Sequence, residues 1–375
     1  MRLIFALVVA MSLMAQSGQH APSSGVTGFG EVAKKAEGAR QASKTVDAIE
    51  LYQQALKLKP TWSEGWWYLG TLYYDSDQYP QGRDAFRKVT LQEPKLPVGW
   101  AMLGLCEFET KEYDRSLEHL RRAGSMGMDP EQGFYEVARY HEALLLTRSG
   151  DFDAAIAVLA RLIGTNTQAS PKLIEAMGLA CLFKPVLPNE YNPVEREFVL
   201  AVGRAMSQAA ARHGPEAAAQ LQTLIADHPG APQLHYLCGL VLLPSDSDKA
   251  LDMLKQELAV SPGHEQAEIS AAGEYLKRSE YKEALPFAEK AVEVNSRDFA
   301  SHAMLGRVLA EGDIDTARGL KELETAARLS PNSIQVHFAL ATAYAKAGRK
   351  EDAARERAEF LRLRSETDGE TTQAH

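Results

Sequence analysis

The sequence predicts an all-α protein, a right-handed superhelical solenoid of about nine or ten helical hairpins. Its first support is a fixed period, because Trp66 recurs as Trp100 and Pro60 recurs as Pro94, thirty-four residues apart in both cases. Its second support is composition, since alanine and leucine are abundant, charge is interspersed and long alternating β-branched runs are missing. Periods of this length are typical of stacked repeat units.

The first helix of the hairpin is predicted from spacing. Four residues fall at i, i+3, i+4 and i+7, which is one helical face: Trp66, Leu69, Gly70 and Tyr73. The glycine allows a second helix to approach closely, and the aromatic side chain fills the space around the contact. A polar stretch at 75–78 suits a turn. The second helix buries Phe86 and ends at Pro94, because proline cannot continue the hydrogen-bond ladder.

These residues resemble the tetratricopeptide repeat family, whose pattern is W-x2-L-G-x2-Y, then A-x3-F, then a late Pro. The first copy departs from the pattern at Gly82, and the second at Glu107, which replaces the tyrosine. The resemblance spans about residues 29 to 363 and implies that the motif residues hold hairpins together. The repeat-packing residues are Trp66, Leu69, Gly70, Tyr73, Phe86, Trp100, Leu103 and Gly104.

Six segments are expected along the chain. They are a signal peptide at 1–15, a flexible lead-in at 16–28, repeats at 29–182, a proline-rich insertion at 183–193, repeats at 194–363 and a disordered tail at 364–375. Pro185, Pro188 and Pro193 exclude a helix from the insertion. It is either an ordinary connection between repeats or a loop that contacts a ligand or breaks the superhelix into two halves.

The N-terminus predicts export. A positive Arg2 precedes an almost entirely apolar run at 3–15, and small and polar residues follow, which is the anatomy of a secretory signal peptide. The run is too short to span a bilayer. We expect cleavage after Ala15 and a periplasmic or secreted location in a bacterium. An uncleaved anchor at a membrane surface is the alternative.

The residues that could carry chemistry form no known constellation. His141-Glu142 lacks the second histidine of a zinc-protease motif, and no phosphate-binding glycine loop or nucleophile elbow occurs. Cys106, Cys181 and Cys238 fall in different repeats, so we expect buried apolar fillers rather than disulfides. The sequence therefore predicts no enzyme, no cofactor and no metal. A net charge of −9 argues against nucleic acid as a partner.

The resemblance implies that the first helices of successive hairpins line a concave groove that binds peptides. Groove positions lie one residue off the packing stripe. The candidate peptide-binding residues are Trp67, Thr71, Tyr74, Leu105, Phe108, Tyr140 and Leu144. Aromatic side chains can anchor an interface because they offer large area at low entropy cost. The alternative is that they pack between the helices of adjacent repeats.

The expected partner is a protein or peptide. One sub-class of the family clamps a C-terminal carboxylate with Lys, Asn and Arg, but Thr71, Ala101 and Leu105 stand at the corresponding positions here, so the clamp is absent. An apolar groove favours a hydrophobic or aromatic peptide, or a partner helix. We expect a non-catalytic scaffold of the cell envelope. The alternative is a structural or accessory subunit of a larger envelope assembly or enzyme complex, and membrane contact is expected only if the N-terminal segment is not cleaved.

Overall fold

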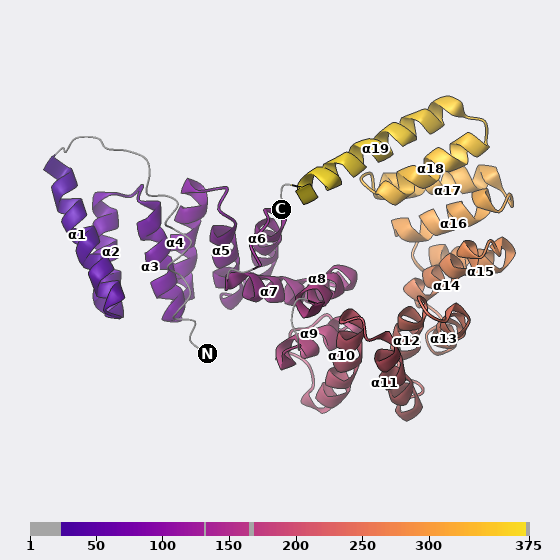
Figure 1. Ribbon diagram of the computed structural model, residues 1–375, viewed down its shortest axis with the longest axis horizontal. Coiled ribbons are helices and arrows are strands. Elements are labelled where there is room, and N and C mark those ends of the chain that lie inside the picture. The colour runs from indigo at the N-terminus through magenta and orange to yellow at the C-terminus, as the bar shows by residue number, and fades with distance from the viewer. Residues whose placement is uncertain (1–23, 131–132, 165–168, 373–375) are drawn as a thin grey trace. The chain divides into compact units, whose positions relative to one another are not determined.

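The computed structural model describes residues 24–130, 133–164 and 169–372, and in these ranges it contains helices and no strand. The predicted all-α repeat fold is confirmed. The chain divides into two compact units, one ending at Val194 and one beginning at Glu195 (Figure 1). The predicted signal peptide and most of the lead-in lie outside the described residues.

The first unit consists of four hairpins and a single helix. Its helices are α1 (Ser24–Gln41), α2 (Thr45–Leu58), α3 (Ser63–Asp75), α4 (Tyr79–Gln92), α5 (Pro97–Glu109), α6 (Tyr113–Ser125), α7 (Phe134–Ser149), α8 (Phe152–Gly164) and α9 (Pro171–Cys181). Each helix packs against the next one in the chain. After α9, residues 182–192 form turns in place of a second helix and lead to a short 3-10 helix, η1 (Pro193–Glu195).

The second unit consists of five hairpins. Its helices are α10 (Arg196–Ala210), α11 (Gly214–Asp227), α12 (Leu234–Leu242), α13 (Ser247–Val260), α14 (Glu265–Lys277), α15 (Tyr281–Val294), α16 (Phe299–Glu311), α17 (Thr316–Leu329), α18 (Ile334–Lys346) and α19 (Lys350–Thr372). Here too each helix packs against the next one in the chain. The first helices of neighbouring hairpins are also in contact: α14 contacts α16, and α16 contacts α18.

The motif glycines mark where the two helices of one hairpin meet. A Cβ atom on Gly70 would lie 2.9 Å from the ring of Phe86, and one on Gly104 would lie 2.8 Å from Cγ of Leu120. Real Cβ contacts are not this short, so only glycine allows the second helix to lie so close. Gly70, Gly104 and Phe86 therefore have the packing role that was predicted for them, and they pack between the two helices of a single hairpin.

The turn between the two helices repeats its backbone conformation. After most of the first helices, though not after α12, the first or second residue has a positive φ, and this position aligns those hairpins with one another. It is occupied by Asp77 (58°), Lys111 (62°) and Gly150 (84°) in the first unit, and by Arg212, Ser279, Asp313 and Gly348 in the second. Residues at equal distance from this position are equivalent in successive repeats, a relation used below.

The helical array extends beyond both predicted ends. α1 begins at Ser24, within the segment expected to be a flexible lead-in, and α19 continues to Thr372, within the expected disordered tail. Ion pairs along the helix explain part of the C-terminal extension, because Arg362 contacts Glu359 at 2.5 Å and Glu366 at 2.6 Å. Among the described helices, none is both long and apolar enough to cross a membrane.

Candidate functional site

Three of the seven predicted groove residues are buried in the core of the first unit. Trp67, Leu105 and Leu144 are 3%, 1% and 5% exposed, so they cannot form a free groove surface. The indole of Trp67 meets the ring of Phe86 edge-on at 5.5 Å. The prediction was wrong for these residues because a first helix is covered by its own second helix and by neighbouring hairpins, which buries positions beside the motif stripe as well.

The other four predicted groove residues, Thr71, Tyr74, Phe108 and Tyr140, are only partly buried. The hydroxyl of Thr71 donates to the carbonyl of Tyr68 at 2.9 Å. The three aromatic residues belong to a set that we call the aromatic row: Tyr74, Tyr79, Phe108, Tyr113, Tyr140 and His141.

Contacts within the aromatic row join two repeats. The ring of His141 on α7 lies 4.6 Å from that of Phe108 on α5 and 5.3 Å from that of Tyr140, both edge-on. The structure therefore brings Phe108 and Tyr140 together through a histidine that the prediction omitted. Tyr74 instead pairs with Tyr79 at 5.4 Å, as Phe108 does with Tyr113 at 5.7 Å.

Burial favours the uncharged forms of His141, Tyr140 and Tyr74 in the aromatic row. Burial lowers the pKa of His141, and the nearby charge of Lys172 lowers it further. Burial also raises the pKa of Tyr140 to about 12 and that of Tyr74 further still. The ammonium of Lys172 lies over the Tyr140 ring at 5.1 Å. Two rings of the row are therefore already covered by cations of the chain, Tyr140 by Lys172 and Tyr113 by Arg148.

The motif tryptophans hold the connection between repeats. Nε1 of Trp66 donates to the carbonyl of Pro60 at 2.8 Å, and Nε1 of Trp100 donates to that of Pro94 at 2.9 Å. In the second unit a histidine takes the same place, with ring nitrogens 3.0 and 2.8 Å from carbonyls six residues earlier. These histidines are His302, facing Ser296, and His337, facing Pro331. The same six-residue offset is present in the sequence for the tryptophans and the histidines, but histidine is not part of the family pattern, so the motif did not predict this equivalence.

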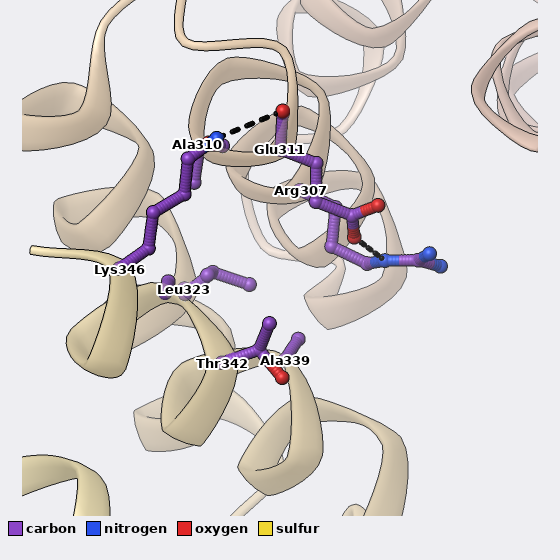
Figure 2. A pocket seen from close by; sticks show the side chains of 8 residues that line it. Arg307, Ala310, Glu311, Leu323, Ala339, Thr342 and Lys346 are labelled. Atoms are coloured by element: carbon purple, nitrogen blue, oxygen red, sulfur yellow. Dashed lines mark hydrogen bonds and ion pairs between the residues drawn. The ribbon is translucent and has the colours of Figure 1, made fainter. Parts of the chain in front are cut away.

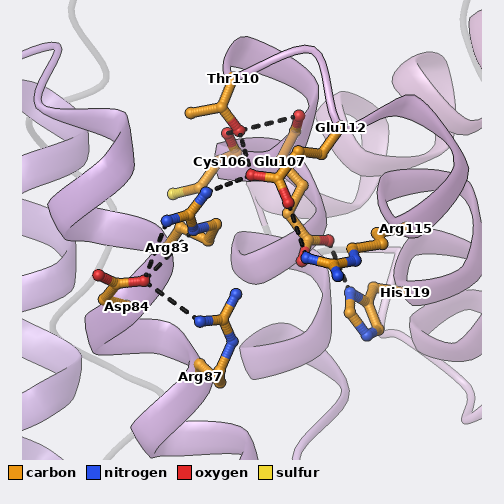
Figure 3. A network of polar contacts seen from close by, with 9 residues as sticks. All are labelled: Arg83, Asp84, Arg87, Cys106, Glu107, Thr110, Glu112, Arg115 and His119. Atoms are coloured by element: carbon orange, nitrogen blue, oxygen red, sulfur yellow. Dashed lines mark hydrogen bonds and ion pairs between the residues drawn. The ribbon is translucent and has the colours of Figure 1, made fainter.

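Glu107 replaces the family's tyrosine, and its environment explains the exchange. The carboxylate is 1% exposed and lies 2.6 Å from Nδ1 of His119, on the second helix of the same hairpin. Figure 3 shows this pair beside a second group of polar contacts, in which Arg83 of α4 reaches Glu112 and Thr110 bonds the same carboxylate. The contact of Arg83 with Glu112 ties α4 to the next hairpin, whereas that of Glu107 with His119 lies within one hairpin.

The second unit contains a small, partly enclosed hollow between α16, α17 and α18 (Figure 2). Its floor is apolar and its rim is polar. The lining residues are Arg307, Ala310, Glu311, Leu323, Ala339, Thr342, Ala343 and Lys346. Arg307 pairs with Glu311 at 2.7 Å, and Lys346 donates to backbone carbonyls of α16, so the rim charges are already engaged.

The three cysteines are buried and unpaired, as expected of apolar fillers. Burial raises the pKa of Cys106 and Cys181 to about 12 and that of Cys238 to about 11, so each remains a thiol at neutral pH. Within the described ranges, no three His, Cys, Asp or Glu side chains are grouped so that they could hold a metal ion.

Comparison with known proteins supports the repeat assignment. Residues 68–127 match a family model described as tetratricopeptide repeat. No curated protein matches the chain. Similar solved structures include a MamA chain from Desulfovibrio magneticus RS-1 (23% identity, 45% of this chain and 96% of that one, TM-score 0.41) and yeast Tom70 (11% identity, 93% and 96%, TM-score 0.38). Residues 68–127 are therefore similar to the tetratricopeptide repeat, and the described residues as a whole form helical hairpins of the same kind.

Proposed function

We propose that the protein is a non-catalytic scaffold that binds a protein or peptide through the aromatic row of its first unit. The observation that carries this proposal is the half-buried chain of rings from Phe108 through His141 to Tyr140, which spans two repeats. Rigid aromatic side chains with one exposed face are the commonest energetic anchors of protein interfaces. A peptide that lies across α5 and α7 would cover them.

Affinity purification with quantitative mass spectrometry tests the proposal. The full chain, tagged at its C-terminus, is expressed in its native host and compared with a Phe108→Ala/Tyr140→Ala variant. A matched control is Phe299→Ala, which removes a 38% exposed ring from the second unit. A partner that wild type and the control retain, and that the double variant loses, supports the proposal. Equal recovery of every partner by all three chains would overturn it.

We also propose that the protein acts outside the cytoplasm, in the periplasm or as a secreted protein. The proposal is supported by the sequence of the N-terminus, in which a positive residue is followed by an apolar run and then by small and polar residues. Cell fractionation with N-terminal sequencing of the mature chain tests it. A mature chain that begins near Gln16 in the envelope or medium is expected, whereas a cytoplasmic chain that still begins at Met1 would contradict export.

A second candidate function is that of a subunit in a larger assembly. The last hairpin leaves Phe338 and Leu361 58% and 56% exposed, and the ring of Phe338 lies 5.5 Å from that of Phe360. An apolar face at the end of a repeat array can stack on another subunit. Multi-angle light scattering of the purified mature chain distinguishes self-assembly from a monomer, and Phe338→Ser should lower the mass if this face is used.

A further inference from the structure

One surface of the first unit combines two half-buried rings with three carboxylates that have no cation. Tyr74 and Tyr79 meet edge-on at 5.4 Å, and the hydroxyl of Tyr79 donates to Asp77 at 2.7 Å. Asp75 and Glu109 complete the set, and both are surface side chains. We call these five residues the acidic aromatic patch. It lies at the C-terminal ends of α3 and α5, beside the start of α4.

The carboxylates of the patch occupy positions where a negative charge does not stabilise the folded chain. Asp75 is the last residue of α3 and Glu109 is the last residue of α5, one repeat apart, and the C-terminal end of a helix disfavours negative charge. In the described part of the chain, no ion pair reaches Asp75, Asp77 or Glu109. Arg83 on the neighbouring helix α4 is engaged with Glu112 and Asp84.

The pKa shifts of the patch agree with this geometry. Partial desolvation raises the pKa of Asp75 and of Glu109, although both side chains reach the surface, and the charge of Asp77 raises that of Glu109 further. Burial raises the pKa of the two tyrosines, and the nearby carboxylates raise it further. A cation placed among these groups would oppose the part of each shift that comes from the carboxylates.

The next repeat of the same unit shows which cation fits. Counted from the positive-φ residues Asp77, Lys111 and Gly150, Tyr113 is equivalent to Tyr79 and Arg148 is equivalent to Glu109. The guanidinium of Arg148 lies over the Tyr113 ring at 4.6 Å and pairs with Glu190 at 2.6 Å. This chain therefore covers the second tyrosine with its own arginine, and at the first one it places a carboxylate instead.

The second unit gives an independent parallel. Relative to Asp313 and Gly348, Glu311 is equivalent to Asp75, and Lys346 is equivalent to Glu109. The ammonium of Lys346 lies 2.7 Å from Asp313 and donates to the carbonyls of Ala310 and Glu311 at 2.9 and 3.0 Å. Here too the chain supplies a cation at the position that Glu109 holds in the first unit.

We propose that the acidic aromatic patch binds an arginine side chain from a basic segment of the protein partner. Its planar guanidinium stacks on a tyrosine ring and bonds carboxylates through two parallel N–H groups, whereas an ammonium cannot do both. The inference rests on the proposed scaffold function and adds the chemistry of the partner. The other rings of the aromatic row, from Phe108 to His141, would contact apolar residues of the same segment.

Fluorescence anisotropy with defined peptides tests this. The probe is a labelled eight-residue peptide of alternating glycine and arginine, and the comparison peptides carry citrulline or lysine in place of arginine. Wild-type mature chain should bind the arginine peptide about tenfold more tightly than the citrulline peptide and more tightly than the lysine peptide. Equal binding of the arginine and citrulline peptides would overturn the proposal.

Two variants locate the binding. Glu109→Arg supplies the cation that Arg148 supplies one repeat later, so it should fill the patch and reduce affinity about tenfold or more. Glu118→Arg makes the same change of net charge at an exposed position of α6, and it should leave affinity nearly unchanged. Asp75→Asn is a milder second test, and circular dichroism establishes that each variant is folded. If Glu118→Arg weakens binding as much as Glu109→Arg, general charge attraction explains the result and the patch is refuted.

The peptide-binding experiment can fail while the proposed scaffold function stands, and the reverse is also possible. A chain that captures a native partner through Phe108 and Tyr140 but ignores the arginine peptide keeps its scaffold role and loses this inference. A chain that binds the arginine peptide, with Glu109→Arg abolishing binding, supports the patch even if no native partner is captured.

Discussion

Substitution of Glu268 by glutamine should stabilise the second unit at pH 8. Glu268 lies on α14, is 6% exposed, and within the described residues it has no hydrogen-bond donor. Burial raises its pKa from 4.5 to about 7, against a smaller opposite effect of the Lys290 charge. This difference corresponds to at most about 3 kcal/mol between the two protonation states, at 1.36 kcal/mol per unit.

The sign follows from proton linkage. The folded state holds the proton more tightly than the unfolded state, so ionisation costs stability as the pH rises from about 4 through about 7. Glutamine has no charge to bury, and its advantage should therefore be complete at pH 8 and should disappear near pH 4. Above pH 8 no further change is expected from this group.

Urea denaturation followed by circular dichroism at pH 8 and pH 4.5 measures the difference. Glu283→Gln, an exposed position of α15, is the matched control and should change the midpoint little at either pH. Because a repeat array can unfold in parts, the comparison uses the transition that shifts with Glu268→Gln. A variant that is less stable than wild type at pH 8, or equally stabilised at both pH values, would refute the account of Glu268 as a buried charge.

Three further outcomes are expected from the packing. Gly306→Ala should destabilise the chain by about 1–3 kcal/mol, because its Cβ would lie 2.7 Å from Leu323, whereas Gly263→Ala, with open space around it, should be near neutral in thermal melts. His119→Ala should cost about 3 kcal/mol in urea unfolding, because it leaves the buried carboxylate of Glu107 without a partner. Ellman's reagent should label none of the three buried thiols rapidly in the native chain and all of them in urea; fast native labelling of any one would contradict its burial.

The interior of each hairpin could be predicted from the sequence because its contacts are local. The spacing of Trp66, Leu69 and Gly70 defines a helical face, and Phe86 follows at the distance that one turn and one helix allow. These contacts recur with the period, so two copies suffice to find them. The role of Trp66 in the connection to the preceding repeat follows the same logic, since its partner, Pro60, belongs to the motif too.

The surface of the array could not be predicted in the same way. Whether Trp67 faces solvent depends on how the neighbouring helices cover it, and a motif that repeats along one helix carries no information on that coverage. Cation–ring contacts such as that of Arg148 with Tyr113 depend on residues that differ from repeat to repeat. They become visible only when equivalent positions are compared in the folded chain, and the acidic aromatic patch emerges from such a comparison.

The same comparison explains why Glu268 is costly where it stands. Its repeat position is that of Trp66, Trp100, His302 and His337, whose ring nitrogens each lie within hydrogen-bond distance of the carbonyl six residues earlier. For Glu268 that residue is Pro262, and an ionised carboxylate has no proton to give to a carbonyl. Glutamine has an amide N–H, so Glu268→Gln should stabilise the chain at pH 8 more than the similarly sized but apolar Glu268→Leu. If leucine is the more stabilising of the two, removal of the charge accounts for the whole effect, and the donor role of this repeat position does not extend to α14.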